Sequence, residues 1–172
     1  EGADLVIFSG GKGVRGPQGT GILIGKKELI GAAYANAAPH QFIGRGMKVA
    51  KEEIVGLVEA LRIFLAEDEN EQMERYRGMC AKVLDAFVEV PGLNVEIKHD
   101  EFDYLVPTVL LSFTKEWSGL GRDQVLESME NENPRIFLWQ LGNPDELGIE
   151  PLNLDEDELD IVIEKLREKL IN

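Results

Sequence analysis

Cysteine and long apolar runs are scarce in this sequence of 172 residues, and each scarcity excludes a class of protein. The single cysteine, Cys80, cannot form an internal disulfide, which favours a reducing compartment such as the cytoplasm. The longest apolar stretches, such as residues 106–113, are interrupted by Pro107 and are too short to cross a bilayer. The first residues also lack a signal-peptide pattern. We therefore expect neither a membrane span nor a secreted domain held together by disulfides.

Positive charge is also in short supply, with 18 Lys and Arg against 32 Asp and Glu and a net charge of −14. Affinity for a phosphate backbone comes mainly from Lys and Arg, so the composition argues against a nucleic-acid partner. The first fifty residues depart from this average, because they hold six Lys and Arg, only three acidic residues and 11 of the 18 glycines. Glycine combined with positive charge suits an anion bound against exposed backbone N–H groups.

Hydrophobic patterning divides the first half of the chain into two short strands and three helices. Apolar runs at 4–8 and 21–25 predict strands that lie inside a sheet covered on both faces. A short helix is expected at 27–33, followed by a loop over 35–47. Apolar residues at spacings of three and four then predict a helix from Lys51 to about residue 65 and a second one from Met73 to Phe87, which Pro91 follows.

The remaining segments predict a small α+β domain with the order ββαββα. We expect strands at 93–98 and 104–113, a helix at 121–130, strands at 135–140 and 147–152, and a closing helix at 155–170. Asp155 followed by Glu158 matches a capping box at the start of that helix. The acidic runs at 67–71 and 155–158 lack the spacing of metal ligands, so we expect no metal site.

The segment 9–21 carries the clearest chemical signal, because Lys12 follows a strand and lies between Gly11 and Gly13. A phosphate loop of the GxxxxGK[ST] type does not match, since a glycine follows the lysine and no helix pattern comes next. Small neighbours let a planar ring approach, and desolvation favours the neutral amine that forms a Schiff base. Such a lysine is what a pyridoxal phosphate enzyme needs, and an exposed loop lysine is the alternative.

Two blocks of sequence carry a family resemblance: residues 2–25, with Ser9-Gly10-Gly11-Lys12 and Gly16-Pro17-Gln18, and residues 43–53, with Gly44-Arg45-Gly46-Met47-Lys48. They resemble the selenocysteine-synthase-like family of fold-type I pyridoxal phosphate enzymes. The ammonia-lyases for phosphorylated amino sugars in this family are also similar to the two blocks. The resemblance covers residues 2–65 well and the rest through the order of elements. It implies an α/β fold in which the edge of the cofactor-binding large domain precedes the small C-terminal domain.

The resemblance also implies roles for individual residues. Lys12 is the expected lysine bonded to pyridoxal phosphate and the base that moves the α-proton, and the Ser9 hydroxyl is expected to contact the cofactor phosphate. Arg45 and Lys48 are the expected holders of an anionic substrate group, although some relatives have arginine where this chain has Lys48. Arg135 is a candidate for the substrate carboxylate. Each of these last three roles has an alternative. The Ser9 hydroxyl could bond its own turn, Arg45 and Lys48 could form a solvated basic loop, and Arg135 could be an ordinary arginine at a strand edge.

The resemblance predicts that part of the active site lies outside this sequence. In the family, the aspartate that pairs with the pyridine nitrogen lies some two dozen residues before the lysine, whereas only eleven residues precede Lys12. We therefore expect residues 1–66 to be the C-terminal part of the large domain and residues 67–172 to be the linking helix and small domain. By itself, such a chain would have little activity.

Three functions remain open from the sequence. We favour a lyase that abstracts an α-proton and eliminates a group from a small anionic amino substrate, as a homodimer or higher homo-oligomer. A selenium transferase acting on seryl-tRNA is the second, and it would call for an extensive basic surface. A non-catalytic dimerisation or binding remnant of the fold is the third.

Histidine is a residue type suited to acid–base catalysis near neutral pH, so His40 is a candidate for such a role, but a lone loop histidine is more often a surface residue.

Overall fold

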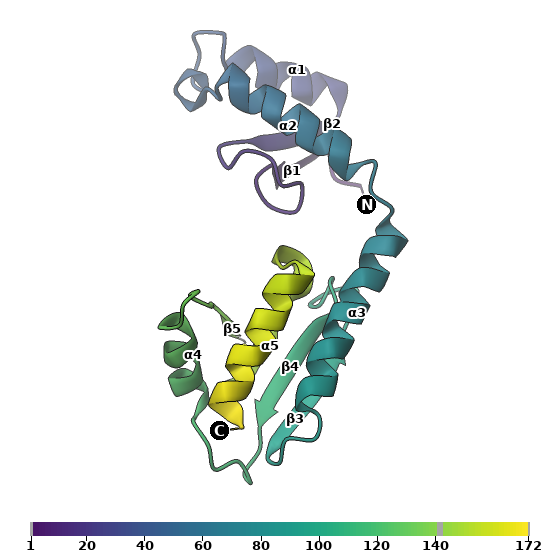
Figure 1. The fold of residues 1–172 in the computed structure, drawn as a ribbon. Helices are drawn as coiled ribbons and strands as arrows, with labels where there is room; N and C mark the ends of the chain where they lie inside the picture. The colour runs from purple at the N-terminus through teal and green to yellow at the C-terminus, as the bar shows by residue number, and fades with distance from the viewer. Residues whose placement is uncertain (1, 141–142, 172) are drawn as a thin grey trace. The chain divides into compact units, whose positions relative to one another are not determined.

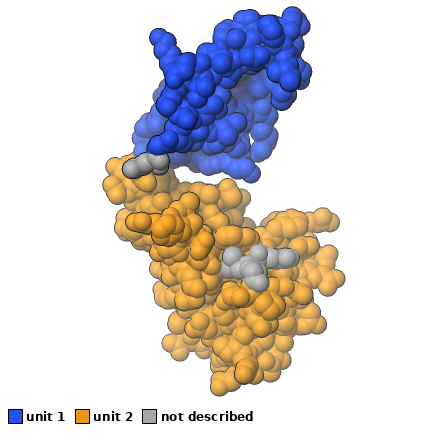
Figure 2. Space-filling model, turned by 180° about the vertical axis from the view of Figure 1, so that it is seen from behind, with its two compact units in different colours: residues 1–67 blue, residues 68–172 orange. Residues whose placement is uncertain are grey.

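The computed structural model describes residues 2–140 and 143–171, and the chain forms two compact units, residues 1–67 and 68–172 (Figures 1 and 2). The sequence placed a domain boundary between residues 66 and 67. No helix in the described part of the chain is long and apolar enough to cross a membrane.

Unit 1 is a β-hairpin with two helices. Strands β1 (Leu5–Ser9) and β2 (Gly21–Gly25) pair antiparallel, with Leu5 opposite Gly25 and Ser9 opposite Gly21. Helix α1 (Lys27–Asn36) follows, and a single 3₁₀ turn, η1 (Arg45–Met47), leads to helix α2 (Lys51–Phe64). Helix α1 is three residues longer than predicted, and the Asn36 side chain ends it by donating to the Ala32 carbonyl at 2.9 Å. In Figure 1 both helices lie on the same side of the hairpin.

The strands of unit 1 are not buried, contrary to the sequence prediction. Ile7 is 77% exposed and Ile24 is 54% exposed, and neither α1 nor α2 holds a buried residue. The reason is that β1 and β2 pair only with each other among the described residues, so no second strand or second layer of helices covers them. The buried residues of this unit, Gly10, Val14 and Thr20, all belong to the loop between the two strands.

Unit 2 is a four-stranded antiparallel sheet with three helices. Its strand order is β3 (Leu93–Lys98), β4 (Thr108–Phe113), β6 (Glu146–Ile149) and β5 (Trp139–Gln140). The helices are α3 (Glu69–Phe87), α4 (Arg122–Glu130) and α5 (Glu156–Leu170), and η2 (Pro151–Asn153) is a 3₁₀ turn. Helices α3 and α5 pack against each other, and α3 packs on β3 and β4 (Figure 1). This is the ββαββα order that the sequence predicted.

The helices of unit 2 follow their local signals closely. The predicted capping box is present, since Glu158 N–H donates to the Asp155 carboxylate at 2.8 Å and Asp155 N–H donates to the Glu158 carboxylate at 3.0 Å. Helix α3 begins at Glu69, four residues before the predicted start at Met73, because the Asp68 carboxylate caps it by accepting from the N–H groups of Asn70 and Glu71. The apolar stripe of α5 is buried as predicted: Leu159, Val162, Leu166 and Leu170.

Strand β3 has the predicted bounds, whereas the other three strands of unit 2 are shorter than predicted, for reasons that lie outside each strand. Strand β4 begins at Thr108 rather than at 104, because Tyr104 N–H donates to the Asp100 carboxylate in a turn that precedes the sheet. Strand β5 begins at Trp139 rather than at 135, because Ile136 N–H donates to the carbonyl of Met129 at the end of α4. The predicted strand 147–152 ends at Ile149, where the 3₁₀ turn at Pro151 follows.

Cys80 is expected to be inert to alkylation in the folded chain. Its thiol is 1% exposed and donates to the Pro107 carbonyl, with 3.2 Å between sulfur and oxygen, and burial raises its pKa to about 11. The thiolate, which is the reactive form, is therefore scarce at neutral pH. We expect no iodoacetamide adduct by mass spectrometry at pH 7.5, and complete labelling in denaturant. Labelling of the native chain at the denatured rate would contradict this placement.

Candidate functional site

The loop between β1 and β2, residues 10–20, is held in one shape by its own backbone. Gly10 N–H donates to the Thr20 carbonyl at 3.0 Å, and Gly16 N–H donates back to the Gly10 carbonyl at 2.8 Å. Thr20 closes the loop, because its hydroxyl donates to the Pro17 carbonyl at 2.6 Å. These bonds cross-link the loop at its neck, so the residues between are positioned by a rigid base.

Helix α2 packs against this loop and leaves no space at two of its glycines. A Cβ on Gly10 would lie 2.2 Å from the Thr20 hydroxyl and 2.6 Å from a Leu57 methyl group, and one on Gly16 would lie 2.8 Å from the Gly10 carbonyl. Gly13, by contrast, has nothing within 4 Å of such an atom. Glycine is therefore required at the neck for close packing, and the tip of the loop is open.

Lys12 lies at the open part of the loop. Its carbonyl accepts from Arg15 N–H at 2.7 Å, which turns the chain back, and Arg15 has a φ of 59°. The Arg15 guanidinium pairs with Glu67. Among the residues that the structure describes, the Lys12 amine forms no hydrogen bond or ion pair, and Lys12 is exposed. Arg15 is thus engaged within unit 1, and Lys12 is available to a ligand.

Ser9 is the last residue of β1, three residues before Lys12. Its backbone is fixed by the pairing with Gly21, and within the described part of the chain its hydroxyl forms no hydrogen bond. The alternative in which this hydroxyl bonds its own turn is therefore not seen. Because only two residues separate them, Ser9 and Lys12 both lie at the C-terminal end of β1.

Arg45 is the first residue of the 3₁₀ turn η1, and Lys48 directly follows its last residue. Gly44 anchors this segment to the end of α1, since its N–H donates to the Asn36 carbonyl at 2.8 Å and a Cβ there would lie 2.7 Å from the same oxygen. Lys48 is exposed. The Arg45 Nε is buried and has no hydrogen-bond partner among the described residues, which leaves it open to an acceptor. No bond in the described chain joins either residue to Lys12 or Ser9.

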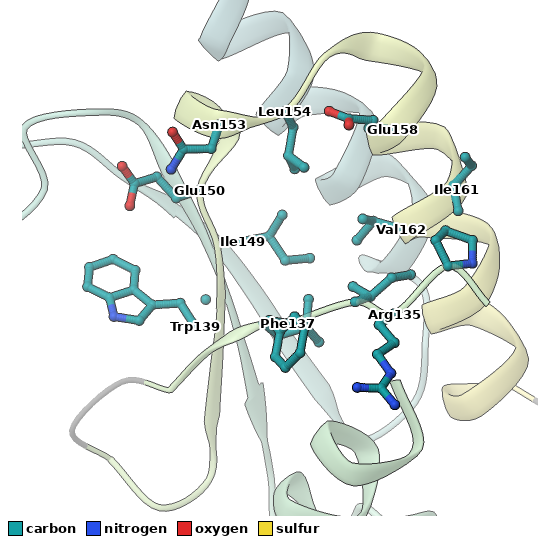
Figure 3. Close-up of a pocket in the computed structure, with 14 residues that line it drawn as sticks. Arg135, Phe137, Trp139, Ile149, Glu150, Asn153, Leu154, Glu158, Ile161 and Val162 are labelled. Carbon is teal, nitrogen blue, oxygen red and sulfur yellow. The ribbon is translucent and has the colours of Figure 1, made fainter. Parts of the chain in front are cut away.

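Arg135 and His40 lie apart from the glycine-rich loop in the chain. Arg135 belongs to unit 2, where it is exposed and does not begin a strand as predicted; it lines a cavity of about 470 Å³ (Figure 3). His40 donates from Nδ1 to the Tyr34 carbonyl at 3.0 Å and packs edge-on against the Tyr34 ring. No group of three or more metal-ligating side chains occurs in the part of the chain that the structure describes.

The family model described as SelA, L-seryl-tRNA selenium transferase, matches residues 1–87. The chain belongs to the SelA family. The matched range contains the hairpin, the lysine loop, the basic turn η1 and the two helices that follow. The resemblance carried by Lys12 and Arg45 in the sequence is therefore confirmed at the level of the family.

Two curated relatives extend over nearly the whole chain. A 5'-C-glycyluridine monooxygenase-decarboxylase of Streptomyces sp is 32% identical over 99% of this chain and 42% of its own length. A D-glucosaminate-6-phosphate ammonia lyase of Salmonella typhimurium is 29% identical over 97% of this chain and 43% of its own length. This SelA-family chain thus spans less than half the length of the curated relatives it matches.

Solved structures place the fold among the fold-type I pyridoxal phosphate enzymes. The structure of D-glucosaminate-6-phosphate ammonia-lyase matches 98% of this chain and 44% of its own, with a TM-score of 0.74 and 27% identity. The Escherichia coli cysteine desulfurase CsdA matches 97% of this chain and 46% of its own, with a TM-score of 0.60 and 20% identity, which shows the fold alone. The predicted fold class is therefore confirmed.

Three residues of unit 2 were not singled out from the sequence: Trp139, Glu150 and Asn153. They line the same cavity as Arg135, although Trp139 and Glu150 are eleven residues apart. The pairing of Trp139 with Gly148 brings them together across the β5–β6 hairpin. The one feature of the sequence that could have pointed to this cavity is Glu150, a carboxylate between the apolar strand residue Ile149 and Pro151.

Proposed function

We propose that this chain is the C-terminal part of a pyridoxal phosphate-dependent lyase that acts on a small anionic amino substrate. The observation that carries the proposal is the Lys12 amine, which has no partner among the described residues and lies at the tip of a loop with a rigid neck. The SelA-family match over residues 1–87 and the ammonia-lyase relative support it. The homo-oligomer expected from the sequence belongs to the same proposal, and a cytoplasmic location stays a prediction.

The described residues fit such a cofactor in two respects. Lys12 offers an amine beside Gly13, which has open space around it and leaves room for a planar ring. Ser9 offers a hydroxyl with no hydrogen bond in the described chain, at the end of the same strand. When bound, pyridoxal phosphate supplies an electron sink that makes the α-proton of an amino substrate acidic. A serine hydroxyl and a lysine three residues apart would hold its phosphate and its aldehyde carbon.

The reaction we propose uses Lys12 and the basic turn. With its amine free, Lys12 would accept the α-proton of the substrate at Nζ. Arg45 and Lys48 would bind the anionic group of the substrate, and the Arg45 Nε would gain the acceptor that it lacks in the described chain. A group on the carbon next to the α-carbon would then leave with its bonding electrons, a double bond would form between the two carbons, and the abstracted proton would remain on Lys12 Nζ. Arg135, in unit 2, is a further candidate for a substrate carboxylate.

Selective modification of Lys12 tests the proposal. Pyridoxal phosphate is added to the 172-residue chain, the adduct is fixed with borohydride, and peptide mapping locates it. We expect an absorbance band that borohydride removes and an adduct concentrated on Lys12, because its amine has no partner in the described chain and the Ser9 hydroxyl lies three residues before it, whereas Lys26 and Lys51 are held in ion pairs. Lys12→Ala should abolish the band, whereas Lys27→Ala, on the exposed start of α1, should keep it.

An adduct spread evenly over the surface lysines, or a band that survives Lys12→Ala, would exclude the cofactor role. In that case the non-catalytic remnant of the fold becomes the better description. The substrate class needs a separate measurement, in which a full-length enzyme containing this chain is screened for ammonia release from phosphorylated amino sugars and small amino acids, because the chain by itself is expected to have little activity. Release from phosphorylated substrates that Arg45→Ala abolishes would support the lyase, and release from neutral amino acids alone would contradict the anionic substrate.

A further inference from the structure

Unit 2 contains a cavity that the proposed chemistry of Lys12 does not use. It has a volume of about 470 Å³, within the range of small-molecule sites, and lies between residues 134–139, strand β6, η2 and the first turns of α5 (Figure 3). Residues 135–138 would close this gap if they continued the β5–β6 ladder. They do not, because the Ile136 N–H bonds to α4 instead.

The middle of the cavity is apolar. Ile149 and Val162 form its floor and are 3% and 6% exposed, and Phe137 stands over them at 71% exposure. Figure 3 shows Phe137 and Ile149 in the centre of the site, with Val162 to their right on α5. A hydrocarbon body the size of a phenyl ring would bury this surface and the open face of Phe137.

One end of the cavity is polar and has negative character. Trp139, Glu150 and Asn153 lie together at this end in Figure 3, and Arg135 lies at the other. Within the described residues, the Glu150 carboxylate forms no hydrogen bond or ion pair, and the Trp139 indole N–H and the Asn153 amide have no partners either. Burial raises the pKa of Glu150, as expected for a partly buried carboxylate that lacks a compensating cation.

The charge of the surrounding unit favours a cation at this end. Residues 68–172 hold 10 Lys and Arg against 25 Asp and Glu, a net charge of −15. Such a field raises the local concentration of cations. An aromatic face beside a carboxylate is also the combination that binds an ammonium group, through a cation–π contact and a charge-assisted hydrogen bond.

We propose that this cavity binds a small amine, whose ammonium group lies against Glu150, Trp139 and Asn153 and whose apolar body covers Ile149, Val162 and Phe137. All the residues that line the cavity belong to unit 2, and amine binding there needs no pyridoxal phosphate. Arg135, the candidate for a substrate carboxylate in the proposed lyase, lines the opposite end of the cavity and takes no part in binding the amine.

Three probes that differ only in their polar end test the proposal: 2-phenylethylamine, 2-phenylethanol and 3-phenylpropanoate. Binding to the 172-residue chain is followed by ¹⁵N NMR on the Trp139 indole N–H. Trp117 is an internal reference, because its indole N–H already donates to the Leu120 carbonyl at 2.8 Å. We expect the amine to bind about tenfold more tightly than the alcohol, the carboxylate to bind most weakly, and the Trp139 signal alone to shift.

Glu150→Gln should remove the preference for the amine over the alcohol while leaving alcohol binding unchanged. Glu164→Gln is the matched control, since it removes an exposed carboxylate of α5 that does not line the cavity. Lys12→Ala should leave amine binding intact, which separates this site from the proposed cofactor chemistry. Equal binding of the three probes, no binding, or equal shifts at both tryptophans would overturn the proposal, and the comparison of probes on the unsubstituted chain decides it even if Glu150→Gln fails to fold.

Discussion

Phe87→Ala should lower the free energy of unfolding of unit 2 by about 3–5 kcal/mol. Phe87 is the last residue of α3 and is fully buried in the core that α3, α4 and α5 form with the sheet. Truncation would remove a ring from the place where α3 meets β3 and α5, and a packed interior of this kind relaxes only in part. The cost therefore includes the lost burial and the cavity that remains.

Urea unfolding followed by tryptophan fluorescence measures this effect, because both tryptophans, Trp117 and Trp139, lie in unit 2. Phe102→Ala is the matched control: Phe102 is 85% exposed, and its truncation should cost no more than about 0.5 kcal/mol. If both variants unfold at the same urea concentration, Phe87 does not occupy the centre of the core.

Gly10→Ala should open the neck of the lysine loop. The new methyl group would meet the Thr20 hydroxyl at 2.2 Å, and that hydroxyl cannot turn away without losing its bond to the Pro17 carbonyl. Overpacking of this kind costs about 1–3 kcal/mol. Amide exchange of residues 10–20, followed by mass spectrometry, should therefore become about 5- to 150-fold faster.

Gly13→Ala separates the packing effect from a general effect of alanine in the loop. Nothing lies within 4 Å of the added atom, so exchange in the loop should stay at the level of the unsubstituted chain. If the proposed function holds, Gly10→Ala should also reduce the amount of borohydride-fixed adduct on Lys12, because the loop that positions the amine is no longer held rigid at its neck. Equal protection in the two variants would show that the neck is not closed by Gly10.

Elements with a complete local signal were predicted well. Helix α5 has its cap at Asp155 and Glu158 and a stripe of apolar residues at helical spacing, and both decide its start and its buried face without help from elsewhere. The placement of Lys12 between glycines after a strand is equally local. The family could be recognised from such segments because short, specific residue patterns carry it.

Strand lengths and burial could not be predicted in this way. Residues 104–107 and 135–138 look like strand by composition, but the Tyr104 N–H donates to the Asp100 carboxylate and the Ile136 N–H donates to the Met129 carbonyl. The apolar pattern of β1 predicted burial, yet Ile7 is largely exposed because burial depends on which layers cover the strand. In each case the deciding partner lies outside the strand itself, in a preceding turn, a neighbouring helix or another layer.

The sequence by itself determined the helices, the family and the lysine loop, because caps, apolar spacing and glycine positions act over a few residues. The tertiary structure decided which side chains meet. It paired Arg15 with Glu67 across 52 residues, left the Arg45 Nε without a partner in the described chain, and brought Trp139 to Glu150 through the β5–β6 pairing. Such contacts depend on register and packing between segments, which no local pattern specifies.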